Sequence, residues 1–161
     1  MIKILFVCLG NICRSPMAEA IFNGLIQKYG LAGFIESDSA GTSDYHIGEP
    51  PDSRTLGVVH KYQLKLDHQG RQFTTGDFNK FNYIIAMDES NLSNIQRQLP
   101  KSADNKKILL MREFDEQADS QSVPDPYWSS EDGFEEVYQI LHRSCQNFIN
   151  YLKKNHPELA Q

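Results

Sequence analysis

The chain has 161 residues, of which 40% are hydrophobic and 23% charged, and we expect one globular domain over residues 1–161. Its formal net charge is −5 and it has no dense basic run that could follow a nucleic-acid backbone, so nucleic acid is disfavoured as a partner. No segment approaches the run of about 18 apolar residues that a membrane-spanning helix needs, so we expect no membrane partner.

The cysteines indicate a reducing compartment. There are three, Cys8, Cys13 and Cys145, and an odd, low count argues against a disulfide framework. Polar residues follow the apolar segment 4–9 too soon for a signal peptide, so we expect a cytoplasmic protein. The cysteines and histidines are scattered and form no CxxC pair, so we expect neither a metal nor another cofactor.

The N-terminal segment predicts a strand, a loop and a helix. Residues 2–7 are nearly all apolar, as in a strand buried on both faces of a sheet. A loop over residues 8–14 follows. Ser15 as the N-cap and Pro16 at the first helical position are start signals, and apolar residues then recur at helical spacing until Gly30.

The rest of the chain continues the alternation of strands and helices. In chain order we expect a strand at 34–40, a helix at 53–62, a buried strand at 81–87, a helix capped by Asp88 or Ser90, a strand at 107–111, an aperiodic polar stretch at 112–124 and a C-terminal helix with an apolar face from Phe134 to Leu152. This order predicts an α/β fold, a four-stranded parallel sheet with helices on both faces. The loop over residues 8–14 follows the first strand, where such sheets bind ligands, and we expect it to be a phosphate-binding loop on the grounds given next.

Cys8 and Arg14 bracket the loop between the first strand and the first helix. A loop of this length can turn its backbone N–H groups inward as an anion-binding nest, to which the helix N-terminus adds partial positive charge. Arg14 can grip two oxygens of a tetrahedral anion, and the same field favours the thiolate of Cys8. The alternative, a buried structural cysteine, does not explain the Gly-Asn turn and the arginine that follow it.

Residues 7–16, Val-Cys-Leu-Gly-Asn-Ile-Cys-Arg-Ser-Pro, resemble the signature loop of the low-molecular-weight protein tyrosine phosphatases. The likeness spans almost the whole chain, including residues 38–42, 67–72, 87–92 and Asp125-Pro126-Tyr127-Trp128. The resemblance implies hydrolysis of protein phosphotyrosine and small aryl phosphates through a phospho-cysteine, with Cys8 as nucleophile and Arg14 as phosphate clamp.

The resemblance also assigns the general acid. Asp-Pro in a polar loop is by itself only a turn signal, but the family match makes Asp125 the proton donor and later the base that activates water. The stretch 112–124 then reads as a functional loop. We expect Asp125 to be buried beside other anions, which would help it to hold a proton.

Further residues take their roles from the resemblance. Asn11, Ser15, Ser39 and His68 match positions that brace the loop, although each has an ordinary alternative as turn residue, helix cap, strand end or solvated histidine. The substrate-binding positions that we expect are Leu9, Gly10, Asn11, Ile12, Cys13, Ser15, Tyr45, Tyr127 and Trp128. The aromatic members would stack on a phosphotyrosyl ring or serve as ordinary packing. Tyr45 and Trp128 depart from residues common in the family, which puts substrate preference in doubt.

Cys13 has two possible roles. The resemblance implies a reversible Cys8–Cys13 disulfide that protects the nucleophile, and the alternative is a small side chain packed under the loop. Cys145 lies on the apolar helix face and is expected in the core.

Three other functions fit the residues less well. Thioredoxin-coupled arsenate reductases share the loop but need further cysteines, which the chain lacks between Cys13 and Cys145. Phosphoarginine phosphatases tend to have Thr where this chain has Ile12. A phosphate-binding module without turnover does not explain the combination of Cys8, Arg14 and Asp125. We therefore expect phosphotyrosine-containing proteins or peptides as partners, inorganic phosphate as product, and a monomer or weak dimer.

Overall fold

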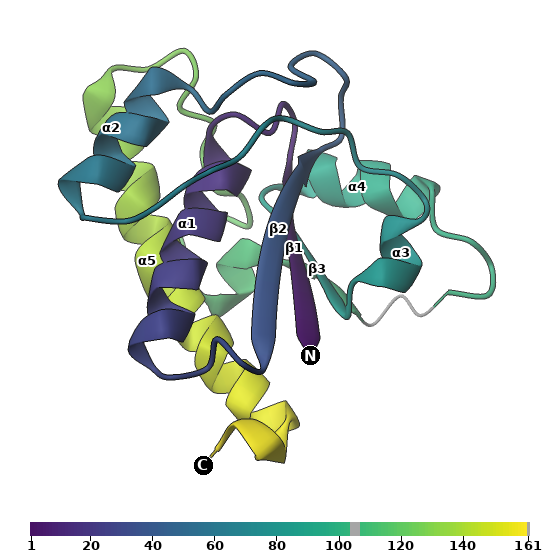
Figure 1. Ribbon diagram of the computed structural model, residues 1–161. Coiled ribbons are helices and arrows are strands. Elements are labelled where there is room, and N and C mark those ends of the chain that lie inside the picture. Colours follow the sequence, from purple (N-terminus) through teal and green to yellow (C-terminus); the bar gives the residue numbers. More distant parts are fainter. Residues whose placement is uncertain (104–106, 161) are drawn as a thin grey trace.

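The computed structural model describes residues 1–103 and 107–160. Its centre is a sheet of four parallel strands in the order β2-β1-β3-β4. Figure 1 shows the neighbouring strands β2, β1 and β3. The strands are β1 (Ile2–Cys8), β2 (Ile35–Gly41), β3 (Tyr83–Ala86) and β4 (Ile108–Leu110). This topology confirms the predicted α/β fold with its four-stranded parallel sheet.

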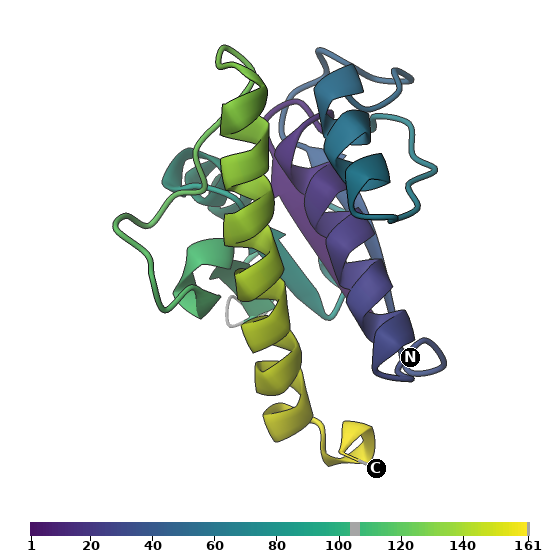
Figure 2. The ribbon, with the colours of Figure 1, turned by 90° about the vertical axis from the view of Figure 1, so that its left-hand side faces the viewer.

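Helices cover both faces of the sheet. On one face α1 (Arg14–Lys28) lies beside α5 (Glu131–Asn155), and α2 (Ser53–Lys61) packs against both (Figure 2). On the other face lie α3 (Asp77–Lys80) and α4 (Glu89–Arg97) (Figure 1). Two short 3-10 helices, η2 (Met111–Phe114) and η3 (Pro157–Leu159), complete the described elements.

Strand β1 supplies the core on both faces because its side chains alternate. Phe6 packs on one side with Phe22 of α1, and Leu5 and Val7 belong to the cluster on the α3/α4 side. Cys8 ends the same strand, so burial of the two faces fixes where its sulfur lies. The predicted burial of this strand on both faces is confirmed.

The element boundaries differ from the sequence prediction at several ends. The third and fourth strands are shorter than the predicted 81–87 and 107–111. They pair with each other only over residues 84–86 and 108–110, and the chain leaves the sheet before and after strands β3 and β4. The second strand begins one residue later than predicted and includes Gly41. Residues 112–124 are not wholly irregular, since η2 occupies their start, and the short helix α3 was not predicted.

The predicted N-cap of α1 is wrong. The helix begins at Arg14, with Cys13 as N-cap and no side-chain capping bond, so Ser15 and Pro16 lie in the first turn rather than at its boundary. The Ser15 hydroxyl is occupied elsewhere, because it contacts the sulfur of Cys8 and accepts from Asn11. Of the two predicted N-caps of α4, Asp88 and Ser90, Asp88 is the N-cap in the structure, and its side chain accepts from the N–H of Asn91.

Strands β1 and β3 flank the point where the strand order reverses, and ligand sites of open α/β sheets lie at the carboxyl ends of such strands. The loop after β1 lies at this edge. In the described part of the chain, no helix has both the length and the apolar character needed to cross a bilayer.

Candidate active site

Cys8 lies at the carboxyl end of β1 and is almost fully buried. Its sulfur is 3.0 Å from the hydroxyl oxygen of Ser15 and accepts the backbone N–H of Asn11 at 3.3 Å. Both groups can donate to a negatively charged sulfur. The surroundings of Cys8 are therefore polar on the side of the loop, unlike those of an ordinary core cysteine.

The loop is held in shape by Asn11, whose φ of 59° places it in the left-handed region. Its fully buried side chain donates to the hydroxyls of Ser15 (2.8 Å) and Ser39 (3.0 Å). Its amide oxygen accepts from the N–H of Arg71 (3.0 Å) and from Nε2 of His68 (2.7 Å). Four residues from α1, β2 and the loop at 68–71 thus meet at one amide group, and the expected bracing partners are together.

The backbone N–H groups of the loop remain available to a ligand. Within the described residues, no hydrogen bond uses the N–H of Gly10, Ile12, Cys13 or Arg14. Strand β2 approaches the loop so closely that a side-chain carbon at Gly41 would lie 2.8 Å from the carbonyl oxygen of Leu9. Free amides that converge at a helix N-terminus make an anion-binding site.

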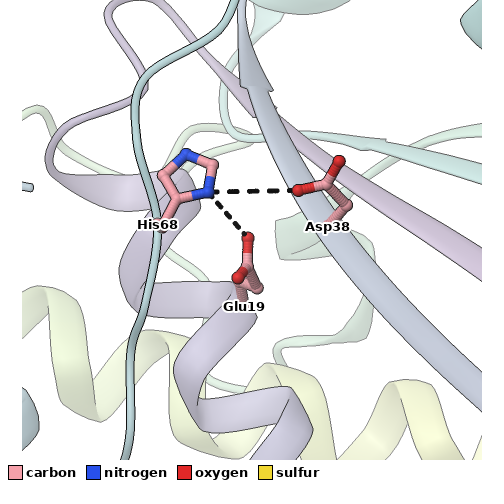
Figure 3. Close-up of side chains that lie close together, drawn as sticks. All are labelled: Glu19, Asp38 and His68. Carbon is pink, nitrogen blue, oxygen red and sulfur yellow. Dashed lines mark ion pairs between the residues drawn. The ribbon is translucent and has the colours of Figure 1, made fainter. Parts of the chain in front are cut away.

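Behind the loop, the buried Glu19 of α1 and the partly buried Asp38 of β2 and His68 lie close together (Figure 3). Because Nε2 of His68 donates to the amide oxygen of Asn11, its Nδ1 faces the carboxylates of Glu19 at 3.5 Å and Asp38 at 3.9 Å. Burial raises the pKa of Glu19 to about 7, against the opposing hydrogen bond from Ser39. Burial also lowers the pKa of His68, so proximity to the carboxylates does not by itself charge this ring.

The same three side chains offer ligand atoms that lie within 4.8 Å of one another, the spacing of a metal site. Each already has a protein partner, however. Glu19 accepts from Ser39, Asp38 accepts from Arg71, and His68 donates to Asn11. We interpret the group as the support of the loop rather than as a metal centre.

Arg14 lies on the side of the loop away from Glu19, Asp38 and His68. It is only 2% exposed, and its Nη1 donates to Asp88 at 2.7 Å and to the carbonyl of Val123 at 3.0 Å. Burial disfavours its charge, but the negative charges of Cys8, Asp88 and Asp125 outweigh this effect and raise the pKa of Arg14 above its usual value. The guanidinium is therefore a permanent cation at a fixed position.

Asp125 lies in the loop before α5, and its carboxylate is 3.6 Å from Nη2 of Arg14. The expectation that it would be buried beside other anions is wrong, because its side chain is 44% exposed and lies beside a cation. One carboxylate oxygen accepts the N–H of Tyr127 at 3.1 Å, which orients the side chain within its own turn. Asp125 is thus held at the rim of the site and remains open to solvent.

These residues surround one cavity of about 380 Å³. Eleven side chains or backbone segments line it, namely Cys8, Leu9, Gly10, Ile12, Cys13, Arg14, Tyr45, His46, Asp125, Tyr127 and Trp128. The three residues expected to be catalytic and seven of the nine expected substrate-binding positions are among them. Asn11 and Ser15 are not, since their side chains lie beneath the loop.

Two cysteines besides Cys8 are buried. Cys13 lines the cavity next to Cys8, and burial, followed by the negative charges of Asp52, Cys8 and Asp125, raises its pKa to about 12. Cys145 is completely buried in α5, as expected, and burial raises its pKa further. All three thiols are free.

Sequence reasoning missed several residues of the site. His46 lines the cavity and its ring faces that of Tyr127, but a histidine in a polar loop carries no signal of this position. Asp88 was identified only as a helix cap, whereas its second oxygen binds Arg14. Glu19 is spaced like an inward-facing helix residue, which is the one sequence signal that it is buried.

Comparisons with known proteins identify the family of this chain. Residues 3–158 match the family model described as low molecular weight phosphotyrosine protein phosphatase. A relative from Schizosaccharomyces pombe with that name is 47% identical over 149 residues, which cover 92% of this chain and 95% of the relative.

Similar solved structures also belong to phosphatases. A protein tyrosine phosphatase from Entamoeba histolytica has a TM-score of 0.92 at 40% identity, covering 96% of this chain and 99% of that one. A Drosophila arginine phosphatase has a TM-score of 0.89 at 35% identity, covering 94% and 98%. The chain therefore belongs to the low molecular weight protein-tyrosine-phosphatases, a class of phosphoric monoester hydrolases.

Proposed function

We propose that the protein hydrolyses protein phosphotyrosine and small aryl phosphates through a phospho-cysteine on Cys8. The observation that carries this proposal is the shared cavity, in which the sulfur of Cys8, the guanidinium of Arg14 and the carboxyl of Asp125 face one space beside four unused backbone N–H groups. A nucleophile, an anion clamp and a proton donor are the groups that such a displacement needs.

In the first step the phosphoryl oxygens occupy the loop and Arg14 binds two of them. Nη1 of Arg14 is already engaged by Asp88 and Val123, which leaves the Nε–Nη2 edge for the phosphate. The Cys8 thiolate forms an S–P bond, and the P–O bond to the phenol breaks with its electron pair going to oxygen. Asp125 gives its proton to that oxygen, so the leaving group departs as a neutral phenol.

In the second step the deprotonated Asp125 takes a proton from water as the water oxygen bonds to phosphorus. The S–P bond breaks and Cys8 leaves as a thiolate, with inorganic phosphate as product. The hydroxyl of Ser15 and the N–H of Asn11 are placed to stabilise the negative sulfur. The exposure of Asp125 suits this second role, because water reaches it directly.

The walls of the cavity favour an aryl phosphate. Leu9, Tyr45, Tyr127 and Trp128 line it, and its three aromatic side chains can stack on the ring of phosphotyrosine, whereas phosphoserine has no ring. Ile12 also lines the cavity, and an apolar side chain offers no hydrogen bond to a guanidino leaving group. This favours phosphotyrosine over phosphoarginine, although one similar structure is named an arginine phosphatase.

We further propose that the activity resides in a single domain, residues 1–161, acting in the cytoplasm as a monomer or weak dimer on phosphotyrosine-containing proteins or peptides. One sheet carries the elements that bring these groups together, since the loop follows β1 and the general acid precedes α5. The proposed chemistry uses no metal, so EDTA should leave the rate unchanged.

Cys13 is proposed as the partner of Cys8 under oxidation. Peroxide would oxidise the Cys8 thiolate to a sulfenic acid, and the Cys13 sulfur would then displace hydroxide, which leaves as water with the Cys13 proton. Because the pKa of Cys13 is raised to about 12, this closure should accelerate with rising pH. Mass analysis after mild peroxide treatment should show loss of two hydrogens in native protein and none in Cys13→Ser. A sulfinic acid on native Cys8 would count against it.

The central test compares substrates and variants. Native protein should hydrolyse para-nitrophenyl phosphate and a phosphotyrosine peptide, and should act poorly on the same peptide with phosphoserine. Cys8→Ser should abolish turnover, whereas Cys145→Ser, remote from the cavity, should retain it if the fold is intact. Turnover that persists in Cys8→Ser, or a preference for phosphoserine, would refute the proposal.

A further inference from the structure

Arg54 joins the phosphate-binding loop to the loop that carries Asp125. It lies in the first turn of α2, next to Asp52, which is the N-cap of that helix. The backbone N–H of Asp52 donates to the carbonyl of Ile12 at 2.8 Å, so this helix start is fastened directly to the phosphate-binding loop.

The guanidinium of Arg54 is fixed on one side by Asp52. Its Nε donates to one carboxylate oxygen at 3.0 Å and its Nη2 to the other at 3.0 Å. The same carboxylate accepts the N–H of Arg54 at 2.9 Å, and these bonds lower the pKa of Asp52. A two-pronged pair of this kind defines the plane of the guanidinium.

The other side of the guanidinium binds the loop that carries Asp125. Nη2 donates to the carbonyl of Tyr127 and Nη1 to the carbonyl of Ser129, both at 3.0 Å. The guanidinium also lies over the ring of Phe134, 4.4 Å from its centroid, where α5 begins. These contacts hold the chain immediately after Asp125.

The chain before Asp125 is held separately. Val123 donates to the carbonyl of Met87 at 2.8 Å and accepts from Arg14 at 3.0 Å. Asp125 therefore lies between two anchored points, one at the end of β3 and one at Arg54. Its own side chain is 44% exposed, so burial does little to hold it and the anchors set its position.

We propose that Arg54 is a positioning residue that places Asp125 for proton transfer to the leaving group. Arg54 does not line the catalytic cavity, so it does not contact substrate there and acts through the carbonyls of Tyr127 and Ser129. A displacement of about 1 Å at a proton donor is enough to slow the chemistry strongly. The inference rests on the proposed role of Asp125.

The test uses leaving groups of different strength. Phenol, with a pKa of about 10, needs protonation as it leaves, whereas para-nitrophenol leaves as a stable anion. We expect Arg54→Met to lower kcat/KM about tenfold for phenyl phosphate and by no more than about twofold for para-nitrophenyl phosphate, a part of the roughly 10²–10⁴-fold that a general acid contributes. General damage to the phosphate-binding loop would lower both rates equally.

Two further variants isolate the mechanism. Arg54→Lys keeps the charge but cannot reach two carbonyls and Asp52 together, so its loss on phenyl phosphate should be intermediate; it also carries the test if Arg54→Met does not fold. Lys61→Met removes a cation from the same helix, where Lys61 pairs with Glu135 at 3.3 Å, and should leave both rates unchanged.

Asp125→Ala, measured in the same series, separates the inference from the proposed function. If Asp125→Ala shows no selective loss on phenyl phosphate, the acid role itself fails. If Asp125→Ala shows the loss and neither Arg54 variant does, the positioning role alone is overturned. Combining Arg54→Met with Asp125→Ala should give no further selective loss, since the group being positioned is gone.

Discussion

The sulfur of Cys8 and the hydroxyl oxygen of Ser15 lie 3.0 Å apart, across the first turn of the helix that follows the phosphate-binding loop. The same hydroxyl accepts from the side chain of Asn11 at 2.8 Å, and its own proton can go to the sulfur or to the more distant carbonyl of Ala40 at 3.4 Å. Ser15 therefore contacts the sulfur of Cys8 from the first turn of α1 and does not cap this helix.

Ser15→Ala should slow turnover because the thiolate loses a hydrogen bond when it leaves phosphorus. A hydrogen bond to a charged group contributes about 1.5–3 kcal/mol, so we expect kcat to fall roughly 10- to 100-fold. Ser144→Ala removes a buried hydroxyl that bonds only within α5, and this control should keep the native kcat. An unchanged kcat in Ser15→Ala would exclude this role.

Asn11→Ala should lower the free energy of unfolding by about 3 kcal/mol or more, because Ser39, His68 and the N–H of Arg71 lose a buried partner. Part of the loss comes from the backbone, since Asn11 has a φ of 59°. Asn11→Gly should therefore be more stable than Asn11→Ala by about 1 kcal/mol. Urea denaturation of the two variants measures both differences, and equal stability of native protein and Asn11→Ala would contradict the network.

Glu19 should make stability depend on pH in a defined window. Its pKa is raised by burial from 4.5 to about 7, so as the pH rises through this range the unfolded chain loses the proton that the folded protein still holds. Stability then falls with rising pH, by about 3 kcal/mol in total, and the loss is complete above pH 7.

Glu19→Gln cannot ionise, so the stability of native protein relative to this variant should fall by about 3 kcal/mol between pH 4.5 and 7. The lowered pKa of His68 gives the opposite slope below its usual value, and this residue is present in both proteins. Denaturation at a series of pH values measures the difference. A constant difference, or one that grows in favour of native protein, would show that Glu19 is not held protonated.

Alkylation should distinguish the two cysteines of the loop. The pKa of Cys13 is raised to about 12, so at pH 7 it is almost wholly a thiol and should not react with iodoacetamide. Cys8 should be modified first and inorganic phosphate should protect it. Peptide mapping by mass spectrometry identifies the site, and equal labelling of Cys8 and Cys13 would be inconsistent with the different surroundings of the two sulfurs.

The sequence identified the strand, loop and helix around Cys8 because each has a local signal: an apolar run, a Gly-Asn turn and helical spacing. It misplaced the start of the helix because Ser15 has the residue type of a cap while its hydroxyl is used by Cys8. That choice depends on the loop folding back over β1, which no local pattern records.

Contacts between residues far apart along the chain could not be predicted either, because they also depend on how the chain folds. Arg54 contacts Tyr127 and Ser129, which lie more than 70 residues away along the chain, and its own neighbours look like an ordinary helix start. The exposure of Asp125 was also misjudged, because burial of a loop residue depends on how the loop is anchored and not on its own sequence.

The most direct test of the account is a rapid acid quench of native protein mixed with an aryl phosphate, followed by mass analysis of the digested chain. The account predicts a phosphoryl group on the peptide that contains Cys8, formed at the rate of the phenol burst and absent in Cys8→Ser. Turnover without this adduct, or a phosphoryl group on another residue, would contradict it.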